Sequence, residues 1–342
     1  MVNHRITRPN RRGLLRLGVG GLAAPLVARF AHAAEINWRI GHTAPAGFPL
    51  HIRLVEAAEA IGRQTDGRME IRVFPDSELG SQIGLLAQVR AGTLDASPIT
   101  GQALASAQAT AALPMAGFAW KDYGLLWRAM DGELGKLIRD QLTLSTRIVA
   151  MERAWDFGFR VVTTANAPIK TAQDLIGLTV RTPVEADLVT LFQALKARPL
   201  AMTLADLYPA LQRKQVEAQE GILPLVVAAR IFTQQTYGSL TNHVWDGHWI
   251  CCAAAPWAKL PDKLKDIVAK ELDNAALKQR DDTVRTVQEA SDFLTKSGMV
   301  FNMVEDKTFR ETLRQAGYYK DWRTRFGDRA WEVLERYSGR LI

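Results

Sequence analysis

The sequence predicts an α/β fold of two units, each a mostly parallel sheet flanked by helices, with one long helix bridging the units. Residues 36–99 alternate between strand and helix patterns, and residues 159–211 repeat that alternation. A single apolar stripe at helical spacing runs from Pro261 to Ser297. Strand–helix–strand order needs crossover connections, which favour parallel sheets with helices on both faces. A chain of 342 residues, of which 47% are hydrophobic, is long enough for about two such units.

The first unit begins with Ile36–Gly41, an alternating stretch that ends at a glycine. Apolar residues at helical spacing follow from Leu50 to Ile61, and Asp66-Gly67 ends that helix. The remaining predicted elements are a strand at 69–73, a helix at 83–89 and a strand at 94–99. Together they predict a β-α-β-α-β unit.

The second unit has the same plan. Thr171 and Asp174 form a capping-box pattern that begins a short helix before Gly177. Thr203 with Asp206 begins a later helix in the same way. The other predicted elements are strands at 159–164 and 178–182 and helices at 184–197, 261–297, 306–316 and 328–337.

Basic charge is concentrated in residues 1–34. They hold six arginines and no Asp, Glu or Lys, and without these arginines the formal net charge falls from +7 to +1. Arg11-Arg12 resembles a twin-arginine motif, Leu17–Ala28 is too short to span a bilayer, and Ala31–Ala33 suits signal cleavage. We therefore predict a twin-arginine export signal at 1–34 and a mature protein in a bacterial periplasm. The nearly balanced remainder argues against a nucleic-acid partner.

Metal, disulfide and cofactor chemistry are not indicated. Cys251 and Cys252 are neighbours, and a vicinal disulfide strains the intervening peptide, so we expect two small buried residues on a strand. His42, His243 and His248 lack metal-ligand spacing, so we interpret them as structural or cleft histidines. The sequence contains no phosphate loop, no Gly-x-Ser-x-Gly and no His-Glu-x-x-His. We predict no cofactor, no metal and no catalytic residue.

Two arginines are the sharpest candidates for a binding site. Arg160 and Arg181 each end a short apolar run, where a strand would stop. In open α/β sheets, ligands bind beyond the carboxyl ends of strands. A guanidinium presents a planar fork that matches a carboxylate, and a hydrogen bond to a charged group contributes about 1.5–3 kcal/mol. The competing interpretation, that both arginines make surface or salt-bridge contacts, stays open at this point.

Tryptophans near the predicted strand ends are candidates for a pocket wall. Trp155, Trp245 and Trp249 lie in such positions, where an indole ring can stack on a ligand. Most tryptophans are core residues, so burial in the core is the competing interpretation. The sequence leaves both roles open.

An ordered set of motifs resembles the DctP-type solute-binding proteins of TRAP transporters. In the family's order and spacing, the set comprises Asn37–Thr43, Phe74–Gly80, Gly92–Asp95, Gly158–Arg160, Asp174–Pro183, Tyr208–Gln212 and Leu240–His243. Each motif is weak alone, but the ordered set is specific and covers most of residues 36–300. The resemblance implies a two-lobed periplasmic-binding-protein fold. Its lobes close by a hinge around a small organic acid, which is delivered to the membrane subunits of a TRAP transporter.

The resemblance also implies ligand-binding residues. Arg181 falls on the family's carboxylate-clamping arginine, and Arg160 falls on its second arginine. The other candidates, from the resemblance and from the tryptophans above, are Thr43, Thr100, Leu204, Glu220, Gly221, Trp155 and Trp245. The family's Gln-Glu-Asn-Pro is Gln219–Ile222 here, so a pocket amide is lost at Gly221. We therefore hypothesise a mono- or dicarboxylate with an apolar or aromatic portion rather than a polyhydroxylated sugar acid.

No low-complexity linker separates the two units, so we expect the chain to cross between them more than once. We expect the first lobe to comprise residues 35–157 and about 244–280. The second lobe would comprise residues 158–243 and about 281–342, including the C-terminal helices.

Two alternative functions stay open. An exported α/β enzyme, a lyase or hydrolase, would act on a small carboxylate in the same cleft. A sensor protein would keep the fold and present its ligand-bound state to a receptor. Turnover of the ligand separates the first alternative from a binding protein.

Overall fold

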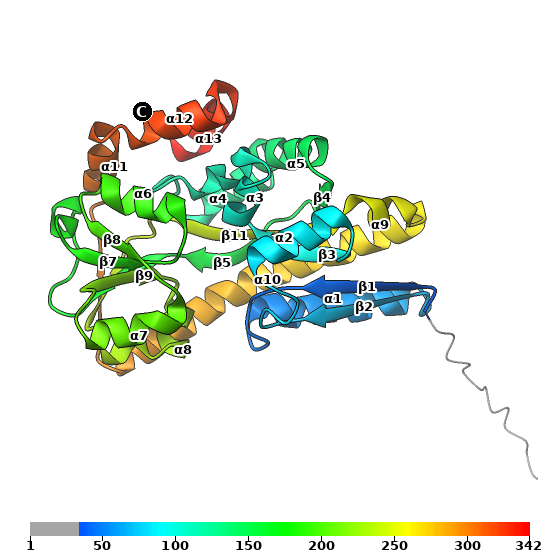
Figure 1. The fold of residues 1–342 in the computed structure, drawn as a ribbon, viewed down its shortest axis with the longest axis horizontal. Helices are drawn as coiled ribbons and strands as arrows, with labels where there is room; N and C mark the ends of the chain where they lie inside the picture. The colour runs from blue at the N-terminus through cyan, green and yellow to red at the C-terminus, as the bar shows by residue number, and fades with distance from the viewer. Residues whose placement is uncertain (1–33) are drawn as a thin grey trace, which may run out of the picture. The chain divides into compact units, whose positions relative to one another are not determined.

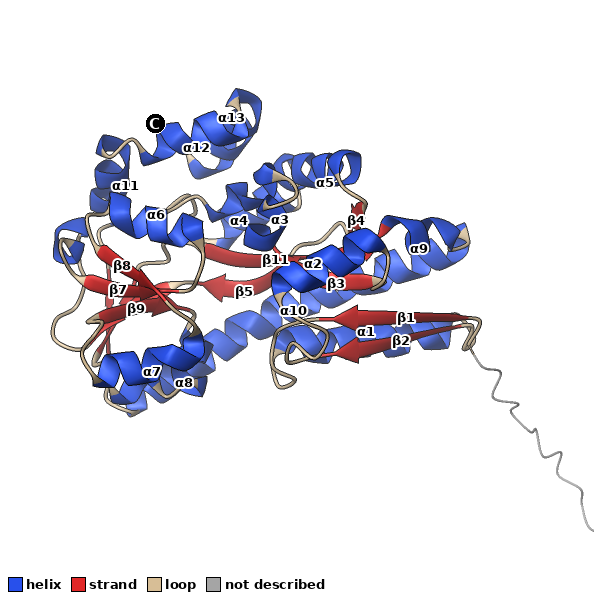
Figure 2. Cartoon of the chain, viewed as in Figure 1, coloured by secondary structure: helices blue, strands red, loops and turns tan. Residues whose placement is uncertain are grey.

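The computed structural model describes residues 34–342, so the predicted export signal lies, but for its last residue, outside the described part. Two six-stranded sheets organise these residues (Figures 1 and 2). The first sheet contains β1 Ile36–Gly41, β2 Met69–Phe74, β3 Ala96–Thr100, β4 Ile148–Ala150, β5 Trp155–Phe159 and β11 Trp245–Ala253. The second contains β6 Val161–Thr164, β7 Thr179–Thr182, β8 Arg198–Ala201, β9 Ala218–Gly221, β10 Tyr237–Leu240 and β12 Val300–Met303.

Helices connect the strands of both sheets. The α-helices are α1 Pro49–Gln64, α2 Gln82–Ala91, α3 Gly101–Ala105, α4 Tyr123–Met130, α5 Glu133–Ser145, α6 Ala186–Ala194, α7 Leu204–Gln212, α8 Leu223–Ala228, α9 Ala254–Lys259, α10 Asp262–Lys296, α11 Asp306–Gln315, α12 Tyr318–Phe326 and α13 Asp328–Ser338. Three short 3₁₀ helices are η1 Ala109–Met115, η2 Ala172–Leu175 and η3 Ile231–Thr233. The predicted capping box is confirmed, because Thr171 and Asp174 make both of its hydrogen bonds at the start of η2. None of the helices within residues 34–342 is both long and apolar enough to cross a membrane.

The first sheet is mixed rather than mostly parallel. Strand β1 pairs with β2 and β3 in parallel, as the β-α-β-α-β pattern predicts. Strand β11 pairs antiparallel with β3, β4 and β5. The sequence pattern did not predict these antiparallel pairs, because β11 comes after strands β6–β10 of the second sheet in the chain. The chain returns to the first sheet only at β11.

Strand β11 of the first sheet lies between two hydrophobic cores. Cys252 lies in the core that includes Trp38 and Leu50 of β1 and α1, whereas Cys251 lies in the core that includes Leu86 of α2. Successive side chains on a strand point to opposite faces, which explains the division. The predicted pair of buried strand cysteines is confirmed, and both thiols are free.

Helix α10 bridges the two sheets, as the sequence predicts. It is unbroken over 35 residues. Its first half packs on α1 and β5, with Leu264 and Leu272 in the core beside β1. Its second half contacts α8, and Leu294 lies in a core with Val161 of the second sheet and Leu223 of α8. Figure 1 shows the helix running along both sheets.

Helices α6 and α7 cover opposite faces of the second sheet (Figure 1). The neighbouring residues Val161 and Val162 of β6 point to different cores. Val161 packs with Leu207 of α7, and Val162 packs with Leu188 of α6. Arg181 lies in β7 and Glu220 in β9, near the carboxyl ends of these strands of the second sheet.

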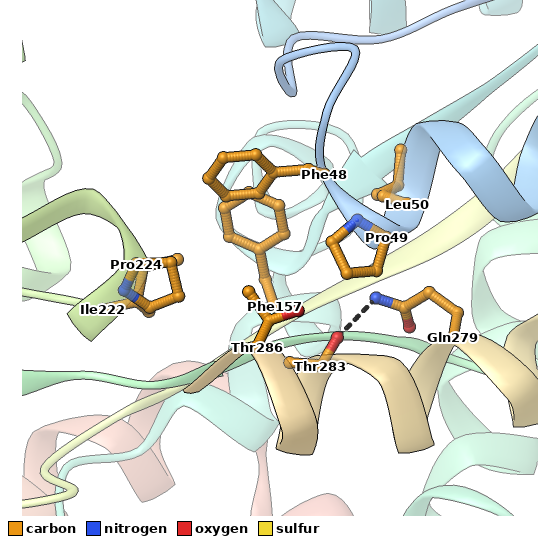
Figure 3. Close-up of a pocket in the computed structure, with 9 residues that line it drawn as sticks. All are labelled: Phe48, Pro49, Leu50, Phe157, Ile222, Pro224, Gln279, Thr283 and Thr286. Carbon is orange, nitrogen blue, oxygen red and sulfur yellow. Dashed lines mark hydrogen bonds between the residues drawn. The ribbon is translucent and has the colours of Figure 1, made fainter. Parts of the chain in front are cut away.

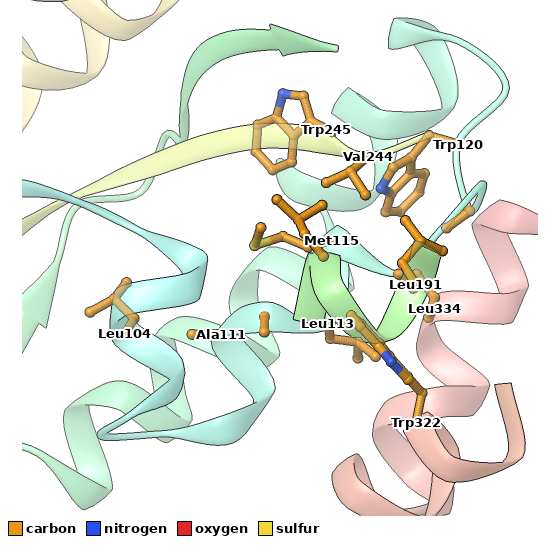
Figure 4. Packing of buried hydrophobic residues seen from close by; sticks show 14 of the residues in the cluster. Leu104, Ala111, Leu113, Met115, Trp120, Leu191, Val244, Trp245, Trp322 and Leu334 are labelled. Atoms are coloured by element: carbon orange, nitrogen blue, oxygen red, sulfur yellow. The ribbon is translucent and has the colours of Figure 1, made fainter. Parts of the chain in front are cut away.

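One core is shared between the two sheets. Leu191 of α6 packs with Leu113 of η1 and Leu334 of α13 (Figure 4). The approach is close, because a Cβ added at Gly117 would lie 2.4 Å from the Leu191 Cδ1. Helices α12 and α13 contact η1, and α13 also contacts α4 and α5, whereas α11 contacts η2 and α6. The expected limits of the two lobes stay a prediction.

Candidate functional site

Arg160 lies between β5 and β6, and its side chain is paired inside the protein. Its Nε and Nη2 donate to the two carboxylate oxygens of Glu220 at 2.6 and 2.9 Å. Its Nη1 donates to Asp246 Oδ2 at 2.8 Å. The pairing is consistent with the antiparallel register, because Glu220 is opposite Val162, and Arg160, two residues before Val162, points to the same face as a diagonal neighbour of Glu220. One N–H remains on each terminal nitrogen of Arg160.

Glu220 is a fully buried acid that stays ionised. Burial opposes its charge, but the positive charge of Arg160 and hydrogen bonds from His243 and Arg160 lower the pKa of Glu220 to about 2. The His243 Nε2 lies 3.1 Å from Glu220 Oε2, and its Nδ1 lies 2.7 Å from Thr241 Oγ1. Burial lowers the pKa of His243, so the ring is neutral at physiological pH. A neutral ring beside an ionised acid carries its proton on Nε2.

Arg181, on β7, has no acidic partner among residues 34–342. Its residue is 5% exposed. Its Nε and Nη2 both donate to the backbone oxygen of Met202, at 3.1 and 2.8 Å. No carboxylate within residues 34–342 forms an ion pair with it, and burial lowers its pKa, with the Glu220 charge opposing that shift. A buried guanidinium without a counter-ion is costly, and its Nη1 still has two donors to offer. This arrangement suits an anion.

The predicted ligand residues of the first sheet are joined by Gln82, which the sequence analysis missed. Its amide nitrogen donates to Thr43 Oγ1 at 3.0 Å, and its amide oxygen accepts from the Thr100 backbone N–H at 3.1 Å. The Thr100 hydroxyl accepts from Ala103 N at 3.1 Å and caps α3. Gln82 therefore ties the ends of β1 and β3 together. In the sequence, the only indication of a role for Gln82 was its position, with Ser81, at the start of a helix.

A cavity of about 460 Å³ is lined by residues at the ends of both sheets. Thr100 and Gln82 line it from the first sheet, and Glu185 and Val184 line it from the connection between β7 and α6. Arg325 of α12 also lines the cavity. The cavity begins three residues after Arg181 along the chain.

A second, narrower cavity lies beside Gly221 and is mainly apolar (Figure 3). Phe48 and Phe157 stack with ring centroids 5.7 Å apart, and Ile222 lies across from them. Gln279 and Thr283 of α10 form its polar side, where Gln279 Nε2 donates to Thr283 Oγ1 at 2.8 Å. A Cβ added at Gly221 itself would lie 3.9 Å from Arg160 Nη2.

Trp155 and Trp245 lie in the core. Both are 0% exposed. The Trp245 Nε1 donates to Asp156 Oδ1 at 2.8 Å, and its ring meets Trp249 edge-on with centroids 6.3 Å apart. Neither indole has a surface open to a ligand in this conformation, so their contact with a ligand stays a prediction. Leu204, the first residue of α7, is 36% exposed.

Side chains of the kinds that bind metal ions are dispersed in the described part of the chain. Within residues 34–342, His, Cys, Asp and Glu form no group of three or more that would hold a metal ion. His42 and His51 contact each other, with Nε2 and Nδ1 3.0 Å apart. Burial and the neighbouring histidines lower the pKa of His42 to about 4, so it is neutral at physiological pH.

The chain resembles known proteins in sequence and in fold. The sequence profile of DctP, described as bacterial extracellular solute-binding protein, family 7, matches residues 40–321. A solute-binding protein of Roseobacter denitrificans is 28% identical over 86% of this chain and 89% of its own length. The 2,3-diketo-L-gulonate-binding periplasmic protein YiaO of Escherichia coli is 26% identical over 87% of this chain and 89% of its own. A crystal structure of a TRAP periplasmic solute-binding protein from Roseobacter denitrificans, with bound β-D-glucuronate, is 25% identical and has a TM-score of 0.80. It covers 88% of this chain and 99% of that one.

Proposed function

Because the chain belongs to family 7 of the bacterial extracellular solute-binding proteins, we propose that it captures a small organic acid and delivers it to TRAP membrane subunits. The observation that carries the proposal is Arg181, a buried guanidinium with no acidic partner in residues 34–342. A carboxylate would supply the missing counter-ion and accept the free Nη1 donors. The ligands named for YiaO and for the solved Roseobacter denitrificans protein are both carboxylic acids.

In this proposal Arg160 has a different role from Arg181. Its fork is occupied by Glu220 and Asp246, so it holds the end of β9 against β6. Its two remaining N–H groups can also donate to a ligand carboxylate. Arg181 is then the main carboxylate ligand, and Arg160 assists it.

The ligand would be enclosed between the two lobes. Support comes from the cavity that Thr100 of the first sheet and Glu185 of the second share. Movement of one sheet relative to the other, with α10 as a continuous support, would open and close this cavity. The division of the chain into lobes at about residues 158, 244 and 281 belongs to this proposal.

An apolar portion of the ligand is part of the proposal. Ile83 and Val184 line the shared cavity, from α2 and from the β7–α6 connection, and they are 57% and 72% exposed. Exposed aliphatic side chains at a cavity gain free energy when a ligand covers them, about 25 cal/mol per Å² of apolar surface. Both named relatives bind sugar acids, so this feature would distinguish the chain from them.

The remaining parts of the proposal concern location and chemistry. Export by the twin-arginine signal would place the protein in the periplasm, where a family of extracellular binding proteins works. The same membership supports capture without turnover, in contrast to the lyase or hydrolase alternative.

Native mass spectrometry of freshly purified protein tests the proposal. We expect a bound small acid at a stoichiometry of about one, because a counter-ion at Arg181 removes the cost of its buried charge. Release and identification of the acid should be followed by prolonged incubation with fresh protein, which should leave it intact. A product that accumulates with time would favour the enzyme alternative. A protein that neither carries nor binds any carboxylate would overturn the proposal.

A further inference from the structure

Glu185 is the acidic counterpart of Arg181, because its carboxylate also lacks a partner. It lies between β7 and α6, four residues after Arg181. Its backbone N–H donates to Pro183 O at 2.8 Å. No hydrogen bond or ion pair of the side chain is formed with any other described residue, and the side chain lines the shared cavity.

The residues that line that cavity from α2, β3 and α3 are uncharged, and they include polar side chains as well as the apolar Ile83. Gln82, Thr100 and Gln102 line it from the first sheet. The Gln102 Oε1 is buried and has no hydrogen-bond partner among residues 34–342. Because that oxygen is buried, the carboxyl group of Glu185 is the acceptor without a partner among residues 34–342 that lines the cavity, and a ligand with a donor could satisfy it.

Every other charge around Glu185 is already neutralised. Arg160 is held by Glu220 and Asp246. Asp187, which lines the same cavity, is held by Arg325 at 2.6 Å. Burial raises the pKa of Glu185 to about 7, and the three neighbouring carboxylates add to the shift, with Arg160 opposing it. The two groups of the site without a partner among residues 34–342 are thus the Arg181 guanidinium and the Glu185 carboxyl group.

We propose that Glu185 selects the ligand by accepting a hydrogen bond from an ammonium or hydroxyl group at the end remote from the carboxylate on Arg181. The inference rests on the proposed function and deepens it. A ligand that enters the cavity displaces water from Glu185, and it binds well only if it replaces the lost hydrogen bonds. A second carboxylate at that end would meet the acceptor oxygens of Glu185 instead, so simple dicarboxylates should be poor ligands.

A matched series of acids tests the proposal by calorimetric titration. The series is butanoate, its terminal hydroxy and amino derivatives, and succinate, with the longer homologues of each. In the unaltered protein we expect the amino or hydroxy derivative to bind at least about tenfold more tightly than the plain acid and the diacid of equal length. The length at which the preference is greatest reports the spacing between Arg181 and Glu185.

Glu185→Gln separates the two donor types. The amide keeps an acceptor but loses the charge, so an ammonium ligand should lose about tenfold in affinity and a hydroxyl ligand only a few-fold. Glu185→Asp keeps the charge but shortens the side chain, so the carboxylate lies farther from the ligand. The loss of affinity should be intermediate. Glu332→Gln, an exposed acid on α13, is the matched control and should bind as the unaltered protein does.

The titrations distinguish failure of this inference from failure of the proposed function. If the acids bind through Arg181 but the diacid is preferred, or if Glu185→Gln leaves the order unchanged, the inference is wrong and the proposed function stands. If no acid in the series binds and Arg181→Met retains the copurified ligand, the proposed function fails and the inference fails with it.

Discussion

Arg181→Met should weaken binding of the copurified acid by about 100-fold or more and leave the protein folded. Two charge-assisted hydrogen bonds at about 1.5 kcal/mol each amount to roughly 3 kcal/mol, and each 1.4 kcal/mol is about tenfold in the dissociation constant. Methionine keeps the volume of the stem but offers no donor. Isothermal titration with the identified acid measures the loss.

The stability of Arg181→Met should change little. The substitution removes two hydrogen bonds to Met202 O, which costs free energy of unfolding. It also removes a buried charge without a counter-ion, which raises the free energy of unfolding by a similar amount. We therefore expect a net change within about 1 kcal/mol for the ligand-free protein, measured by urea unfolding.

Two further variants sharpen the test of Arg181. Arg181→Lys keeps the charge but loses the planar fork, so its affinity should lie between those of the unaltered protein and Arg181→Met. Arg198→Met, on the neighbouring strand β8 with an exposed side chain, should bind normally. Normal affinity in Arg181→Met would show that the carboxylate is held elsewhere.

In contrast to Arg181→Met, Glu220→Gln should cause a large loss of stability. The substitution removes the charge that pairs with Arg160 at 2.6 and 2.9 Å, and both partners are buried. Breaking a buried ion pair by removing one charge costs about 3–5 kcal/mol. Asp246 remains beside Arg160, which favours the lower end of that range. Glu217→Gln, just before β9 and exposed, is the control and should change stability by less than about 0.5 kcal/mol.

The pH dependence of stability gives an independent readout of Glu220. Its folded pKa of about 2 lies below the ordinary value of 4.5, so its contribution is complete above pH 4.5 and is lost as the pH falls toward 2. Asp156 and Glu185 have raised pKa values, of about 6 and 7, and act in the opposite direction as the medium is acidified. The difference between the unaltered protein and Glu220→Gln isolates the one group. Equal stability of the two proteins from pH 7 to pH 2 would contradict the account of this ion pair.

Local patterns were sufficient to predict the elements of residues 36–99 and the bridging helix α10. Both have clear periodicity, because one face of each element is buried and the other is not. The buried segment 109–115 was not predicted. Leu113 and Pro114 illustrate the reason, since both are buried in η1, a 3₁₀ helix that is buried along most of its length and carries a proline. A segment that is buried on all sides has no amphipathic pattern to detect.

The site was predicted only in part. The position of Arg160 and Arg181 after apolar runs pointed to strand ends, and the resemblance identified them as ligands. The sequence did not show that Arg160 pairs with Glu220, which is 60 residues away, and Arg181 with no acid. That difference depends on the register between β6 and β9, which long-range pairing determines.

A crystal structure of the protein with its copurified acid tests the central claim most directly. We expect the carboxylate of the acid to lie within about 2.7–3.2 Å of the Arg181 terminal nitrogens. The bonds from Arg160 to Glu220 should be retained in the complex. A carboxylate bound away from Arg181, with that guanidinium still bonded only to Met202 O, would contradict the account.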